Sequence, residues 1–94
     1  MPRTPRPSPA ALAPGWPTTP SKDAAGEAAR QFAVRLREAV DAKADGSVRK
    51  VARVAGLSHA TLLAILGGAT WADLYTVAKL EVALGEALWR GPVR

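Results

Sequence analysis

Few side chains in this sequence could do chemistry. The only histidine is His59, and the sequence implies no serine or aspartate beside it of the kind that nucleophilic catalysis needs. The chain has no cysteine and no glycine-rich phosphate loop, and its carboxylates fall on the outward faces of expected helices. Because one histidine cannot furnish a metal site by itself, we expect no metal. Because the sequence offers so few catalytic groups, we also expect no enzyme activity and no cofactor.

The charge balance indicates a polyanionic partner. Thirteen Lys and Arg stand against eight Asp and Glu, which gives a net charge of +5. No apolar run approaches the roughly 20 residues of a membrane span, and no signal-peptide core follows the first arginines. The absence of cysteine fits a reducing compartment. We therefore expect a cytoplasmic protein with no membrane partner.

Residues 47–68, SVRKVARVAGLSHATLLAILGG, predict two short helices joined by a tight turn. Ser47 is a good N-cap, and Gly56 ends the first helix because glycine tolerates the left-handed conformation at low cost. Ser58 caps the second helix, in which apolar residues recur at three- and four-residue spacing. Ala52 is small where the two helices come closest, and a larger side chain would separate them. This unit is where we look for function.

The other segments complete an all-α domain. Residues 1–20 hold seven of the eight prolines, and because proline lacks an N–H and fixes φ, we predict a disordered arm there. Residues 21–90 form the domain and residues 91–94 a tail. A helix over 21–43 is expected to bury Phe32, Leu36, Ala39 and Val40. A later helix, capped by Thr70 and stopped by Gly85, is expected to bury Leu74, Val77, Leu80 and Leu84.

The spacing around the turn resembles the helix-turn-helix of the Xre and phage Cro/repressor family. Its signature residues are Ala52, Gly56, Leu57, Ser58, Leu62 and Ile65. Residues 32–40 are similar to the first helix of that family, and residues 70–85 to its fourth, as in small actinobacterial members. The resemblance covers roughly 60 residues and implies a compact four- to five-helix lambda-repressor-like DNA-binding domain. Its partner would be double-stranded DNA.

The resemblance also implies roles for residues of the motif. In such proteins the second motif helix, here residues 59–66, enters the major groove, and the first crosses the phosphate backbone. The side chains facing bases would be Ser58, His59, Ala60, Leu63 and Ala64. Phosphate contacts would come from Ser47, Arg49, Lys50, Arg53 and Thr61. Arg3 and Arg6 of the arm could follow a groove, although a solvated tail is the simpler interpretation.

The sequence departs from the family pattern on its reading face. Ala60, Leu63 and Ala64 stand where long polar side chains usually discriminate bases, and they offer only apolar contact to thymine methyl groups. Specificity would then depend on His59, on DNA shape or on the arm. The family also often has glutamine at the start of the first motif helix, where this chain has Val48, and a second arginine on the first helix, where it has Val40.

We predict a sequence-specific transcriptional regulator, with repression as the favoured mode. The apolar reading face supports a rival: an antitoxin-like or adaptor module that binds a protein partner through the same fold. A purely structural helical bundle is a third interpretation, but it leaves the tight turn and its basic residues unexplained. The residues expected at a partner surface or in a homodimer are Trp71, Tyr75, Lys79, Val82, Leu88 and Trp89.

Overall fold

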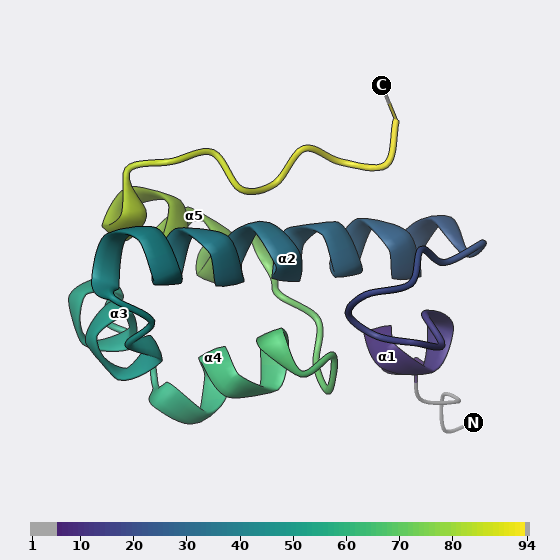
Figure 1. The fold of residues 1–94 in the computed structure, drawn as a ribbon, viewed down its shortest axis with the longest axis horizontal. Helices are drawn as coiled ribbons and strands as arrows, with labels where there is room; N and C mark the ends of the chain where they lie inside the picture. Colours follow the sequence, from purple (N-terminus) through teal and green to yellow (C-terminus); the bar gives the residue numbers. More distant parts are fainter. Residues whose placement is uncertain (1–5, 94) are drawn as a thin grey trace.

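The computed structural model describes residues 6–93, which contain five helices and no strand. The helices are α1 (Pro9–Leu12), α2 (Ala24–Ala44), α3 (Val48–Ala55), α4 (His59–Leu66) and α5 (Leu74–Leu84). The long helix α2 runs through the middle of the molecule, and each of the other four helices contacts it (Figure 1). The all-α prediction is confirmed.

One face of α2 forms the centre of the core. Phe32, Leu36, Ala39 and Val40 are buried there, as the sequence predicted. Val48, Val51 and Ala52 of α3, Leu62 and Ile65 of α4, and Val77, Leu80 and Leu84 of α5 join them in one continuous cluster. Each short helix of this cluster therefore buries one apolar stripe against α2 and presents its other face outward.

The turn between α3 and α4 has the predicted geometry. Ser47 accepts a hydrogen bond from the Lys50 N–H at 3.1 Å, and Ser58 accepts one from the Thr61 N–H at 3.0 Å. Gly56 has φ of 72°, in the left-handed region, and Leu57 is partly buried against the core. Two capped helices are thereby fixed relative to each other by three intervening residues.

Gly56→Val is expected to lower the free energy of unfolding by about 1–3 kcal/mol, because a β-branched residue is strained at positive φ. A Cβ at this position would meet no atom within 4 Å, so the cost is backbone strain and not separation of the helices. Gly56→Asn is the matched control, since asparagine tolerates this conformation better and should lose less. Thermal melts measure both, and equal Tm values for the Gly56→Val variant and the unmodified chain would contradict the assigned turn.

The start of α5 differs from the prediction. The N-cap is Asp73, whose carboxylate accepts a hydrogen bond from the Thr76 N–H at 2.8 Å, and the helix begins at Leu74 and not at Thr70. Leu74 is 81% exposed, so its expected place in the core is wrong. The earlier start was predicted because a threonine followed by an aspartate resembles a capping box, whereas the aspartate is itself the cap.

The prediction of a disordered arm is wrong for residues 6–20, which we call the N-terminal segment. Ser8 caps α1 by accepting from the Ala11 N–H at 3.2 Å, and Pro9 occupies the first helical turn, where a missing N–H costs nothing. Pro9 and Ala13 are buried, and the indole N–H of Trp16 donates to the Leu66 carbonyl at 2.9 Å. The predicted boundary at residue 21 thus does not separate this segment from the domain.

Two glycines make room for the N-terminal segment. A Cβ on Gly26 of α2 would lie 2.8 Å from the Leu12 carbonyl oxygen, and a Cβ on Gly68 would lie 2.8 Å from the Trp16 ring. Both distances are far below ordinary van der Waals contact. Gly26, which weakens a helix in isolation, is therefore explained by the close approach of α1 to α2.

A polar network on α2 holds the end of the N-terminal segment. Arg30 binds both carboxylate oxygens of Glu27 at 2.7 and 2.8 Å and donates to the Pro17 carbonyl at 3.0 Å. Glu27 also accepts from the Ser21 N–H at 2.7 Å. The hydrogen bonds from Arg30, Gln31 and Ser21 hold the pKa of Glu27 well below its usual range. The stability from this carboxylate is present above the usual carboxyl pKa and is lost in strong acid.

Residues 85–93, the C-terminal segment, run without helix along α2 (Figure 1). The Glu81 carboxylate accepts from the N–H groups of Leu88 at 2.7 Å and Trp89 at 2.9 Å. Arg35 donates to the Leu88 carbonyl at 3.3 Å, and the Leu88 side chain is fully buried. Leu88 is therefore a core residue, and its expected place on a partner surface is wrong.

Candidate nucleic-acid interface

Helix α3 carries three cations whose side chains are exposed. Within residues 6–93, Arg49, Lys50 and Arg53 make no side-chain hydrogen bond and no ion pair. Several cations of α2 are paired, since Arg30 binds Glu27 at 2.7 Å, Arg37 binds Asp41 at 2.6 Å and Lys43 lies 3.3 Å from Glu86. The α3 cations are thus available to an external anion.

The sequence around these cations contains no carboxylate. Residues 46–72 hold Arg49, Lys50, Arg53 and His59 but neither Asp nor Glu. Asp45 and Asp73 bound this stretch on either side. Because α3 and α4 contact each other, the positive charge is concentrated on one two-helix unit, although the whole chain carries only +5.

The outward face of α4 is mainly apolar. Ala60 is exposed, Leu63 is 49% exposed and Ala64 is partly exposed, whereas Leu62 and Ile65 point into the core. His59 is partly exposed, and its side chain makes no hydrogen bond within the described residues. Among the residues of α4, it supplies the one long polar side chain on this face.

The hydroxyl groups at the start of α4 are engaged with each other. Ser58 Oγ and Thr61 Oγ1 lie 2.9 Å apart, and Ser58 also accepts from the Thr61 N–H. Ser47 has the corresponding capping role on α3. All three residues were predicted to contact DNA. In the structure Ser47 and Ser58 cap the two helices, and Thr61 is the hydrogen-bond partner of Ser58.

The two arm arginines fall in different parts of the chain. Arg3 lies outside the described residues. Arg6 is exposed, and its guanidinium carbon is 5.9 Å from the centroid of the Trp71 ring, a cation–π geometry. Trp71 also donates its indole N–H to the Pro7 carbonyl at 2.9 Å. Trp71 therefore holds the N-terminal segment, and it lines a different hollow from the groove that Tyr75 lines.

The predicted partner residues on α5 do form one surface, and α3 extends it. Tyr75, Lys79 and Val82 line a shallow groove with Val54 and Ala55 of α3. Val82 is 84% exposed and Val54 is 62% exposed, and the Lys79 ammonium lies 5.3 Å from the Tyr75 ring centroid. Val54 was not among the partner residues predicted from the sequence. Its signal was an apolar side chain on the same side of α3 as the basic residues. Trp89, at 44% exposure, belongs to the C-terminal segment instead.

Other kinds of site are not found in residues 6–93. No group of three or more His, Cys, Asp or Glu side chains that could hold a metal ion occurs there. None of the helices in this part of the chain has the length and hydropathy to cross a membrane.

A solved structure with the same helical arrangement identifies the family. The restriction-modification controller protein C.AhdI from Aeromonas hydrophila matches with 30% sequence identity and a TM-score of 0.55, over 60% of this chain and 83% of that protein. The chain belongs to the Xre-like helix-turn-helix family. No family model and no curated protein matches the sequence. As an Xre-like protein, the chain has α3 and α4 as its motif helices, and the three exposed cations lie on the first of them.

Proposed function

We propose that this Xre-like protein is a sequence-specific double-stranded DNA-binding transcriptional regulator, and specifically a repressor. The observation that carries the proposal is the carboxylate-free α3–α4 unit with three cations that have no partner within residues 6–93. Free Arg and Lys side chains neutralise phosphates, and the release of counterions then drives binding. The similarity to a protein named as a controller supports a regulatory role. We also propose that the protein is of the small actinobacterial type of this family and that it is located in the cytoplasm.

In the proposed complex, α4 lies in the major groove and α3 crosses the backbone. Ser58, His59, Ala60, Leu63 and Ala64 would face base edges, and Ser47, Arg49, Lys50, Arg53 and Thr61 would face phosphates. Since Ala60, Leu63 and Ala64 have no polar side-chain atom, most direct hydrogen bonding to bases would come from His59. The sequence preference should therefore be modest, with a further contribution from DNA shape.

His59→Ala is expected to cost about 1–3 kcal/mol of binding free energy on a preferred duplex and little on a scrambled one. Titrations on a duplex selected from a random pool, and on its scrambled version, measure the difference. Val93→Ala in the C-terminal segment is the control, because Val93 is 85% exposed and lies outside both the α3–α4 unit and the groove between α3 and α5. Equal losses on both duplexes would show that His59 contacts no base edge.

A protein-binding function is the second candidate, and the groove between α3 and α5 favours it. Val54, Tyr75 and Val82 form an apolar surface that no described residue covers. Leu63 on α4 adds a further exposed apolar side chain. This surface would be the contact of a homodimer or, in an antitoxin-like or adaptor module, of a different protein. We rank the DNA-binding function first because the α3–α5 groove does not account for the three exposed cations of α3.

A further inference from the structure

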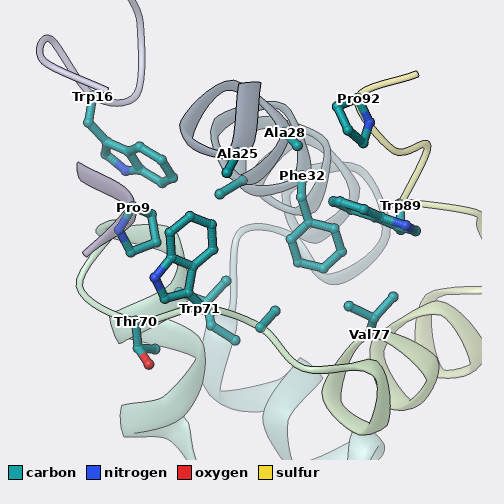
Figure 2. Close-up of a pocket in the computed structure, with 13 residues that line it drawn as sticks. Pro9, Trp16, Ala25, Ala28, Phe32, Thr70, Trp71, Val77, Trp89 and Pro92 are labelled. Atoms are coloured by element: carbon teal, nitrogen blue, oxygen red, sulfur yellow. The ribbon is translucent and has the colours of Figure 1, made fainter. Parts of the chain in front are cut away.

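An apolar cavity lies between the N-terminal segment, α2, the connection before α5 and the C-terminal segment. Its volume is about 270 Å³. Figure 2 shows the rings of Trp16 and Trp71 on one side and those of Phe32 and Trp89 on the other, with Ala25 and Ala28 of α2 between them. Four aromatic rings thus surround a space bordered by small side chains.

The polar atoms of the walls are largely committed elsewhere. Trp16 donates its indole N–H to the Leu66 carbonyl, and Trp71 donates to the Pro7 carbonyl, both at 2.9 Å. These hydrogen bonds fix the positions of the two rings, and the Arg6 guanidinium carbon lies 5.9 Å from the centroid of the Trp71 ring. No charged side chain of the described residues lines it, and the Thr70 hydroxyl points away from the rings. Burying a charged ligand here would leave that charge without a partner.

The size of the cavity sets the size of its ligand. A cavity of about 150 Å³ lined by aliphatic and aromatic side chains binds benzene, so about 270 Å³ suits two fused rings. Flat ligand rings can stack on or meet the edges of the indoles, an arrangement that aromatic pairs favour.

We propose that this cavity is a binding site for a neutral, planar aromatic molecule of about ten non-hydrogen atoms. The proposal does not rest on DNA binding, because the residues that line the cavity include no α3 cation and no outward residue of α4. It adds a small-molecule site to the proposed DNA-binding surface.

The indole N–H signals in a proton–nitrogen correlation spectrum test the proposal directly, since all three tryptophans of the chain line the cavity. Naphthalene is expected to shift these signals in a saturable way. The 2-naphthoate anion, which has the same ring system and a charge, should not. No saturable shift up to the solubility of naphthalene, or equal shifts with naphthoate, would overturn the proposal.

Ala25→Leu fills the cavity from the surface of α2 and should weaken naphthalene binding by at least about tenfold, while the amide spectrum stays that of a folded protein. Ala42→Leu is the matched control, since Ala42 is exposed on the same helix and outside the cavity. If Ala25→Leu fails to fold, Ala29→Leu fills the same space. Undiminished affinity in the folded filled variant would place the naphthalene elsewhere and contradict the site.

Discussion

Deleting residues 1–20 is expected to lower the free energy of unfolding by about 2–4 kcal/mol, because it removes buried surface and hydrogen bonds of the N-terminal segment. The interactions removed include the burial of Pro9 and Ala13, the Trp16–Leu66 hydrogen bond and the Arg30–Pro17 hydrogen bond. Urea denaturation of the full and shortened chains measures the difference. An unchanged midpoint would mean that the segment does not stabilise the domain.

The Gly26→Ala variant tests the packing of α1 on α2 with a single substitution. Helix propensity alone would make this change stabilising by about 0.5–1 kcal/mol. The structure predicts the opposite sign, because the added Cβ would lie 2.8 Å from the backbone of Leu12. A Gly26→Ala variant more stable than the unmodified chain would show that α1 does not pack closely on α2.

Replacing both Arg49 and Arg53 with alanine is expected to weaken binding to every duplex by about 20- to 30-fold at 0.15 M salt, or roughly fivefold for each phosphate that is no longer neutralised. The dependence of log K on log salt should flatten by up to about 0.9 for each such phosphate. Single variants show whether the two effects are additive. Lys22→Ala is the control of equal charge, because Lys22 is exposed just before α2 and outside the α3–α4 unit. A loss of affinity in Lys22→Ala equal to that of either single variant would indicate that only net charge matters.

The motif helices could be predicted because their signals are local. Ser47, Gly56 and Ser58 act on their own turns, and most of the apolar residues of α3 fall on one face of that helix. The roles of the site residues on these helices were implied by the resemblance to the helix-turn-helix family, and the exposure of Arg49 and Arg53 agrees with an external role. Their contact with DNA stays a prediction.

The two ends of the chain could not be predicted because their structure depends on distant partners. Proline density indicated a disordered arm, yet Trp16 binds the carbonyl of Leu66, which is 50 residues away. The exposure of Leu74 and the burial of Leu88 follow from where Asp73 and Glu81 fix the backbone. Gly26 and Gly68 were the available signals, since each removes a side chain where the N-terminal segment approaches. A glycine in a sequence indicates that another group packs closely against the backbone, but it does not identify which segment supplies that group.

The most direct test of DNA binding is a titration of the unmodified protein on double-stranded DNA at several salt concentrations. Three cations on α3, which have no partner among residues 6–93, predict that log K falls linearly with log salt, with a slope of about −2 to −3 per protomer. A selected duplex should bind more tightly than a scrambled one at every salt concentration. Absence of duplex binding at low salt, in a protein that co-purifies with a protein partner, would contradict the account and make the surface of Val54, Tyr75 and Val82 the functional one.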